Sequence, residues 1–330
     1  MTTSILTRRS ALALGGAALA APMLAGQARA AMLDKLVLQT PRSGPAFLLA
    51  HTRAIGAFDA VAPEVDLPLW MGFDQMRAGF VSGDVPVTIM PTQGAASLYN
   101  KGFGMKMLAT VTEGHCGLLS REMENIQVSD LKGKKVVLSG INGFTGHMMR
   151  LGLNHAGIGL DELELIPAAS HMEAAQVILS GRAEAALIAE PASTAALMKA
   201  KAEGISLHRG VQMREVLGQI TGLRPVLPQA CLAIRSEYAE AHPELSAALV
   251  EALKTGAASV NANPAQAAAD AAALLEGKAK VLEQAIPYAS ISVMTASEAR
   301  PEIEALYTAL MAADPKIIGG KMPDDGLFAL

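Results

Sequence analysis

Short apolar runs alternate with helix-like segments along the first third of the chain. Each run is followed by glycine or proline and then by a pattern with the apolar spacing of a helix. Strands alternating with helices in this way predict a parallel, doubly wound sheet. The strands predicted here cover residues 36–39, 65–70, 85–90 and 105–111.

The same alternation begins again after residue 115, and it ends in a long helical region. Strands are expected at 116–120, 136–139, 163–166, 185–189, 205–207 and 231–234. Beyond residue 236 the pattern is helical, with breaks at Pro243, Pro264 and Pro287 and a last helix at 302–313. One α/β set inserted in another predicts two lobes joined by two short strands, with a cleft between them. Lobe 1 is expected at 31–118 with 233–330, and lobe 2 at 119–232.

A glycine-rich turn follows the predicted strand 136–139. Gly140, Gly143 and Gly146 have the spacing G-x-x-G-x-x-G, which is neither the dinucleotide-binding fingerprint nor a P-loop. A helix is expected to begin near Thr145, which we predict as its N-cap. The amide groups of such a turn favour an anion or a polar ligand. The alternative is an ordinary strand-to-helix connection.

The first thirty residues have the pattern of an export signal. Arg8 and Arg9 precede a short apolar stretch, and the segment ends in Ala28-Arg29-Ala30. This order is typical of a signal peptide, and the paired arginines resemble a twin-arginine signal, although Ala11 stands where an aromatic residue is usual. Cleavage after Ala30 predicts a periplasmic product.

Composition narrows the classes of partner. The formal net charge is −4, aromatic residues make up 4%, and no run of lysine or arginine occurs. This balance argues against nucleic acid or an anionic membrane surface as a partner. No stretch after the signal is long and apolar enough for a membrane span, so no direct membrane insertion is expected.

Several polar or aromatic residues stand at the predicted carboxyl ends of the first strands, where ligands of doubly wound sheets bind. Arg42 could clamp an anionic head group, or it could be a solvated loop arginine. Phe73 and Phe144 could sandwich a flat ligand, or they could belong to the core. The candidates of the first strand set are Arg42, Ser43, Gly72, Phe73, Thr92 and Gln93.

Further candidates follow the later strands. Glu190 could bind a ligand amine or brace the hinge, and His115 lies where the chain leaves the first strand set. His115 with Cys116 and Cys231 could in principle hold soft copper. However, lone cysteines usually behave as small buried hydrophobic residues, so no metal is expected. We expect both cysteines to be packed thiols on paired crossover strands, with a disulfide as the alternative.

Four segments together resemble the periplasmic solute-binding proteins of ABC importers, in the branch for nitrate, alkanesulfonates, taurine and thiamine-pyrimidine precursors. They are FDQMRAGFVSGDVPVTIMPTQGAASLYNKG (73–102), SDLKGKKVVLSGINGFT (129–145), AAQVILSGRAEAALIAEP (174–191) and AIRSEYAEAHPEL (233–245). The resemblance implies a type II binding protein whose two α/β lobes close over one small molecule. It implies a membrane permease as partner, a monomer and no cofactor. Ligand contacts would come from Arg42, Ser43, Thr92, Gln93, Asn142, Gly143, Phe144, Thr145 and Glu190.

Two other functions remain open at this stage. The chain could serve a membrane sensor in place of a permease. It could also be an enzyme, because pyrimidine synthases of thiamine biosynthesis and menaquinone-pathway enzymes resemble this fold. The synthases carry a cysteine-rich iron motif, whereas this chain has two cysteines. The menaquinone-pathway enzymes are cytosolic, which conflicts with an export signal, so no enzymatic activity is expected.

Overall fold

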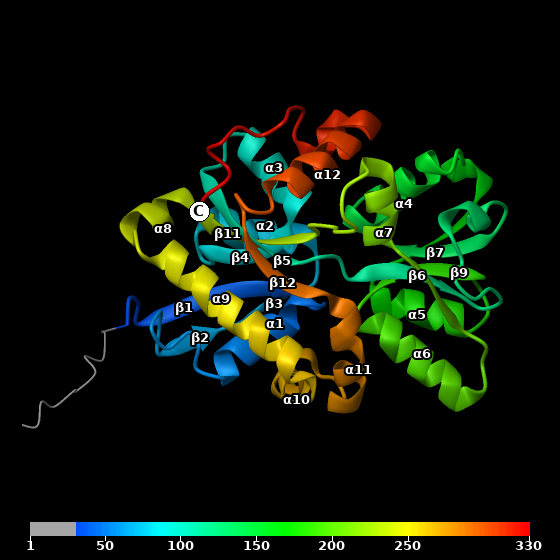
Figure 1. Ribbon diagram of the computed structural model, residues 1–330, viewed down its shortest axis with the longest axis horizontal. Coiled ribbons are helices and arrows are strands. Elements are labelled where there is room, and N and C mark those ends of the chain that lie inside the picture. Colours follow the sequence, from blue (N-terminus) through cyan, green and yellow to red (C-terminus); the bar gives the residue numbers. More distant parts are fainter. Residues whose placement is uncertain (1–30) are drawn as a thin grey trace, which may run out of the picture. The chain divides into compact units, whose positions relative to one another are not determined.

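The computed structural model describes residues 31–330, whose strands form two β-sheets (Figure 1). The predicted signal lies outside the described residues. In the first sheet the strand order is β12-β5-β11-β4-β1-β2, and β3 pairs with β1. Its strands are β1 (Lys35–Pro41), β2 (Glu64–Asp66), β3 (Leu69–Trp70), β4 (Val87–Pro91), β5 (Met105–Thr112), β11 (Ala230–Arg235) and β12 (Ile291–Thr295).

The second sheet is formed by the chain between β5 and β11. Its strand order is β10-β6-β9-β7-β8. Its strands are β6 (Cys116–Ser120), β7 (Lys135–Ser139), β8 (Glu164–Ala168), β9 (Ala185–Ala189) and β10 (His208–Gln212). The second strand set is therefore inserted within the first, as the repeated alternation predicts.

Helices cover both faces of each sheet, because side chains alternate between the faces along the strands. Cys231 and Ala233 of β11 join the core beneath α2, α3 and α12, whereas Leu232 and Ile234 join the core beneath α1, α9, α10 and α11. The helices are α1 (Pro45–Ala54), α2 (Phe73–Ser82), α3 (Thr92–Asn100), α4 (Phe144–His155), α5 (His171–Leu179), α6 (Ala192–Glu203), α7 (Met213–Thr221), α8 (Ser236–Ala241), α9 (Leu245–Ala262), α10 (Pro264–Leu275), α11 (Ala279–Ala289) and α12 (Arg300–Ala313), with 3₁₀ turns η1 (Val128–Leu131), η2 (Leu160–Glu162) and η3 (Pro315–Ile318).

Two short segments carry the chain between the sheets. The outgoing segment lies between β5 and β6, and the returning segment precedes β11. The Leu227 amide donates a 3.0 Å hydrogen bond to the Glu113 carbonyl, so the two segments run side by side. One apolar core extends from the first sheet to the second beside them, and it includes Met90, Cys231 and Leu187.

Both sheets are mixed, which differs from the fully parallel sheet that the alternation suggests. β11 runs antiparallel to β4 and β5, and β6 runs antiparallel to β9 and β10. The predicted strand 205–207 is wrong, because the chain pairs with β6 only from His208 onward. The predicted strand 65–70 is split into β2 and β3, with Leu67 and Pro68 between them.

Two features of the helical C-terminal third also differ from the prediction. β12 pairs with β5 at the edge of the first sheet, in a region whose alanine-rich surroundings indicate helix alone. Helix α11 continues through Pro287, where a break was expected. Burial of Leu282, Ile286 and Ala289 against the core stabilises this helix despite the hydrogen bond that proline removes.

The cysteine prediction is wrong in its placement. Cys116 lies on β6 of the second sheet and Cys231 on β11 of the first, and these two strands do not pair with each other. Both cysteines are buried free thiols. Burial raises the pKa of Cys116 to about 12 and the pKa of Cys231 further, so both are neutral near pH 7.

Candidate functional site

Strand ends of both sheets meet at the crossing segments. β1 and β4 end on the same side of the first sheet as the beginning of the antiparallel strand β11. In the second sheet, β7 and β9 end beside the beginning of β6. Ligands of such sheets bind at the carboxyl ends of parallel strands. This junction is therefore the candidate ligand site.

Gln229 of the returning segment joins the two sides of this site. Its side-chain oxygen Oε1 accepts from the His115 amide at 3.4 Å and from the Cys116 thiol at 3.5 Å. Its Nε2 lies 3.4 Å from Nε2 of His115. The Gln229 carbonyl accepts from the Thr92 amide at 3.3 Å. Gln229 thus connects the β4–α3 turn to the start of β6.

His115 is buried without a complete set of partners. Its side chain is 4% exposed, and no hydrogen-bond partner reaches its Nδ1 atom. Burial, aided by neighbouring His171, lowers the pKa of His115 to about 3. Its imidazole is therefore uncharged near neutral pH. Its Nδ1 atom is free to form a hydrogen bond with a ligand.

Two other buried polar atoms at the strand ends lack partners. They are Oγ1 of Thr40, on β1, and Oε1 of Gln93, in the first turn of α3. Buried polar atoms in proteins are nearly always hydrogen-bonded, because an unpaired one destabilises the fold by about 1–3 kcal/mol. Three such atoms, from Thr40, Gln93 and His115, therefore point to a polar ligand at this junction.

His171 stands at the start of α5, on the side of the second sheet. Its Nδ1 lies 2.7 Å from the Ser139 hydroxyl and accepts a 3.4 Å hydrogen bond from the Ala189 amide. Removal from water lowers the pKa of His171 to about 4. The site therefore contains two neutral imidazoles, His115 immediately before β6 and His171 beside the end of β9.

Glu190 follows β9 and is engaged in a local network. It is 3% exposed; Oε1 accepts from Arg209 at 2.7 Å, and Oε2 accepts from the Thr194 amide at 3.1 Å. Burial raises the pKa of Glu190, and the Arg209 charge counteracts part of that rise. The Arg209 guanidinium carbon lies 3.6 Å from the ring centre of Tyr288 on α11. The sequence allows Glu190 either to bind a ligand amine or to brace the hinge. Its contacts agree with the second role.

The turn between β7 and α4 adopts the strand-to-helix geometry, but its N-cap is Gly143 and not Thr145. A Cβ on Gly146 would lie 1.9 Å from the Ile141 carbonyl oxygen, and Gly140 has φ of +64°. These glycines therefore serve the turn itself. Phe144 and Thr145 are each 8% exposed, and Phe144 belongs to the apolar core. The ring of Phe144 therefore packs in the core and does not face Phe73 across a flat ligand. Asn142 is exposed on the turn.

The candidates from the first strand set divide into two groups. Thr92 and Gln93 are buried at the junction; Thr92 donates to the Pro228 carbonyl at 2.7 Å, and its own carbonyl accepts from Tyr307. Arg42 instead donates at 2.7 Å to the Leu275 carbonyl and to Glu276, beyond the end of α10. Its contacts therefore do not favour an anion clamp.

The remaining candidates of the first strand set lie near the turns that precede α1 and α2. Ser43 is buried, and its amide donates to the Pro41 carbonyl. Phe73 is 38% exposed, and a Cβ on Gly94 would lie 2.5 Å from its ring, so this ring packs against the first turn of α3. Gly72 is the exposed N-cap of α2.

Sequence reasoning missed Thr40, Ser139, His171, Arg209 and Gln229. Thr40 and Ser139 each end a predicted strand or follow it directly, which is the signal that selected Thr92 and Gln93. His171 follows a strand, and Arg209 lies in one, that the sequence predicts one to five residues too early. Gln229 follows Pro228 at the end of a loop, and nothing local distinguishes it.

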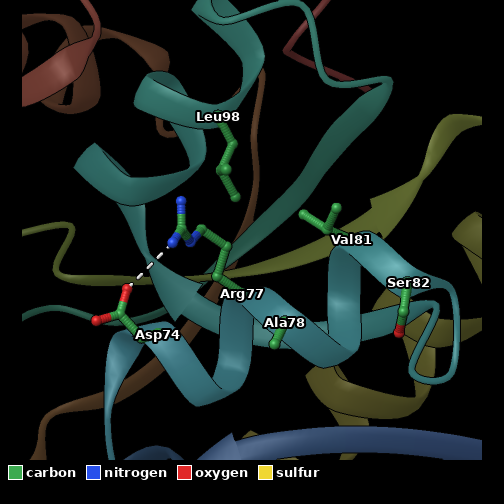
Figure 2. A pocket seen from close by; sticks show the side chains of 6 residues that line it. All are labelled: Asp74, Arg77, Ala78, Val81, Ser82 and Leu98. Atoms are coloured by element: carbon green, nitrogen blue, oxygen red, sulfur yellow. Dashed lines mark hydrogen bonds and ion pairs between the residues drawn. The ribbon is translucent and has the colours of Figure 1, made fainter.

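Two hollows on the described surface lie away from this junction. One, of about 410 Å³, lies between α2 and α3, where Arg77 is directed toward Asp74 at 3.3 Å (Figure 2). The other, of about 270 Å³, lies between η1, α4 and α7. Both are open to solvent and neither contains an unpartnered buried polar atom. We therefore locate the site at the junction, because unpaired polar atoms are buried there, and not at either of these hollows.

A Ser–His–Asp array occurs outside the junction. His51 Nδ1 lies 2.6 Å from Asp270 Oδ2, and His51 Nε2 lies 2.8 Å from Ser259 Oγ. Ser259 is in the body of α9, whose amide groups are used within the helix, so they supply no oxyanion hole. The array links α1, α9 and α10, and we assign it a structural role.

Two other kinds of site are absent from residues 31–330. No group of three or more metal-binding side chains is found there. Among the helices of this part of the chain, none has the length and apolarity needed to cross a bilayer.

The chain matches known proteins in a family profile and in fold. The profile of the family described as NMT1/THI5 like matches residues 75–267. An ABC transporter structure from Parabacteroides distasonis has a TM-score of 0.76 and 19% identity, over 90% of this chain and 99% of that one. None of the curated protein sequences compared with the chain matches it.

Two periplasmic proteins have similar structures. The aliphatic sulphonate binding protein SsuA from Escherichia coli has a TM-score of 0.70 and 14% identity, over 90% of this chain and 92% of that one. The nitrate-binding protein NrtA from Synechocystis PCC 6803 has a TM-score of 0.61 and 13% identity, over 77% and 70%. These likenesses confirm the predicted type II periplasmic binding protein fold.

Proposed function

Because this chain belongs to the NMT1/THI5-like family, we propose that it is the solute-binding component of an ABC importer. It captures one small polar molecule at the junction of its two sheets and delivers that molecule to a membrane permease. The observation that carries this proposal is the set of unpartnered buried atoms of Thr40, Gln93 and His115. A ligand that pairs with them offsets the penalty of leaving them unsatisfied.

The fold supports capture by closure. The chain crosses between the sheets twice, and the two crossings run side by side at Glu113 and Leu227. Bending of such adjacent segments lets two lobes move about a common axis. We assign the lobes as residues 31–118 with 233–330, and residues 119–232. Outside the crossings, contacts such as the Arg209–Tyr288 stack hold the two sides together.

The ligand can be identified without prior assumption. Native mass spectrometry of the purified protein should detect a bound small molecule, and extraction should yield it chemically unchanged. A ligand present at a hundredfold excess over Kd stabilises the folded state by about 2.7 kcal/mol, so the melting temperature should rise. Release of an altered product would refute the proposal in favour of an enzyme.

A variant pair tests the location of binding. Gln93→Ala removes the unpartnered buried oxygen Oε1 and should weaken binding of the extracted molecule by about tenfold, the equivalent of one good hydrogen bond. Gln176→Ala, at an exposed glutamine of α5, is the matched control and should bind like the parent protein. Equal affinities for both variants would contradict binding at the junction.

We further propose that the protein acts in the periplasm after removal of residues 1–30. The relatives SsuA and NrtA are described as periplasmic. Replacing Arg8 and Arg9 with lysine should trap the precursor in the cytoplasm, because twin-arginine export requires both. Cell fractionation with immunoblotting measures this. Normal export of the variant would leave only a general secretory signal.

A further inference from the structure

The hydrogen bonds of Gln229 determine which nitrogen of His115 carries the proton. Its oxygen accepts from the His115 amide and the Cys116 thiol, and a backbone amide can only donate. The Gln229 Nε2 group must then donate to Nε2 of His115. His115 is consequently protonated on Nδ1, the atom without a partner. The group left over is a buried N–H donor.

The same reasoning gives the opposite tautomer for His171. Its Nδ1 accepts from the Ala189 amide at 3.4 Å, so it carries no hydrogen, and the Ser139 hydroxyl at 2.7 Å must donate to it as well. The proton of the neutral imidazole is therefore on Nε2. Within the described residues no hydrogen-bond acceptor is assigned to that N–H.

Both imidazoles flank the end of β9. Cys116 pairs with Ala189 across the β6–β9 ladder, and the Glu190 amide donates to the His115 carbonyl at 2.8 Å. His115 therefore lies on one side of the Ala189–Glu190 peptide, and the His171 ring contacts the Ala189 amide from the other. The two rings are also close enough for His171 to influence the protonation of His115.

We propose that His115 and His171 are the specificity-determining residues of the ligand site. His115 offers its Nδ1–H and His171 its Nε2–H to acceptor atoms on one ligand. This inference rests on the proposed function, because it assigns the contacts of the same site.

The charges around the pair define the class of ligand. Both rings are uncharged, and each presents a donor, so a ligand with carbonyl, carboxylate, sulfonate or nitrate oxygens fits. At the two rings an ammonium ligand offers donors to donors and is disfavoured, whereas the unpartnered Oε1 of Gln93 accepts a donor from another part of the same ligand. The carboxylate of Glu190, which directly follows Ala189, is already paired with Arg209 and the Thr194 amide. It therefore supplies no free site for a cation.

Nuclear magnetic resonance of protein labelled with ¹⁵N-histidine tests the tautomers directly. Long-range ¹H–¹⁵N spectra at pH 7 should place the proton of His115 on Nδ1 and that of His171 on Nε2. Addition of sodium nitrate, sodium ethanesulfonate or uracil should shift both imidazole signals for at least one of these acceptor probes. Methylammonium chloride, a donor-only probe, should shift neither.

Amide substitutions provide a crossed test with internal controls. An asparagine amide mimics the Nδ1 side of histidine, and a glutamine amide mimics the Nε2 side. With the acceptor probe that gives the largest shift, His115→Asn and His171→Gln should bind within about threefold of the parent protein. His115→Gln and His171→Asn should bind about tenfold or more weakly. A purely structural role would affect the two members of each pair alike.

The opposite tautomer at either residue, equal losses within each pair, or no shift with any acceptor probe would overturn the inference. Preferential binding of methylammonium would overturn it as well. These failures are distinguishable from failure of the proposed function. A bound molecule detected by mass spectrometry, together with the wrong tautomers, refutes the role of the histidines and leaves the solute-binding proposal intact.

Discussion

Lowering the pH from 7.5 to 5 should destabilise the protein through the two histidines of the ligand site. Burial lowers the pKa of His115 to about 3 and that of His171 to about 4, whereas both titrate near 6.5 in an unfolded chain. Between these values the unfolded state binds more protons than the folded state, so stability decreases as the pH falls. The contribution is complete above pH 6.5. It is lost progressively toward pH 4 for His171 and pH 3 for His115.

The magnitude follows from the linkage relation. Each histidine contributes a slope of about 1.4 kcal/mol per pH unit below 6.5, so the two together reduce the unfolding free energy by about 4 kcal/mol at pH 5. Glu190 acts in the opposite direction, because burial raises its pKa. Over the range between its unfolded and folded pKa values, the folded state binds the extra proton and gains stability as the pH falls. The net slope is therefore smaller than the histidine contribution alone.

Urea unfolding at pH 7.5, 6 and 5 measures this effect, with the fluorescence of Trp70 as the probe. This residue is the single tryptophan of the chain, and its indole donates to the Ile89 carbonyl at 3.0 Å, so its emission reports on the first sheet. Comparison with His115→Asn and His171→Gln removes the contribution of Glu190. Each variant should have a slope between pH 6 and 5 that is flatter by about 1.4 kcal/mol per unit. Parallel pH profiles for the parent protein and both variants would refute the reasoning.

Three further predictions concern parts of the molecule outside the site. Asp270→Asn should lower the free energy of unfolding by about 1–3 kcal/mol, because buried His51 loses its charged partner; an unchanged urea midpoint would contradict this. Gly256→Ala should destabilise by about 1–3 kcal/mol, because the new methyl group would lie 1.8 Å from the Thr52 hydroxyl; adding Thr52→Ala should restore part of the loss, since the Cβ of residue 52 would still lie 2.9 Å away. Iodoacetamide at pH 8 should label neither cysteine in the folded protein and both in urea, as read by mass; labelling without denaturant would show that the thiols are accessible.

The alternation of apolar runs and helices predicts the elements that position the site, because each buried strand is a continuous apolar segment. This signal selects Thr92, Gln93 and Glu190, and all three follow strand ends in the structure. Strand direction could not be predicted in the same way. An antiparallel strand such as β11 has the same apolar pattern as a parallel one, and its partners are more than a hundred residues distant.

Contacts between distant segments explain the remaining misses. Arg42 has the right residue type and position for an anion clamp, but its hydrogen bonds go to Leu275 and Glu276 at the end of α10. Gln229 has no local pattern, and its role depends on the crossing segment that contains His115. Contacts of this kind form only when the chain returns from the second sheet, so no local sequence pattern predicts them.

The position of β11 determines the order in which a newly synthesised chain can assemble. This strand lies between β4 and β5, in the middle of the first sheet, yet its residues follow the whole second sheet in the sequence. On the ribosome the second sheet is complete at residue 212, while the first still lacks the strand that joins its two halves. Strands β4 and β5 are synthesised earlier, so their facing edges stay unpaired until residue 235 has left the exit tunnel. The part of the molecule made first is the part that finishes folding last.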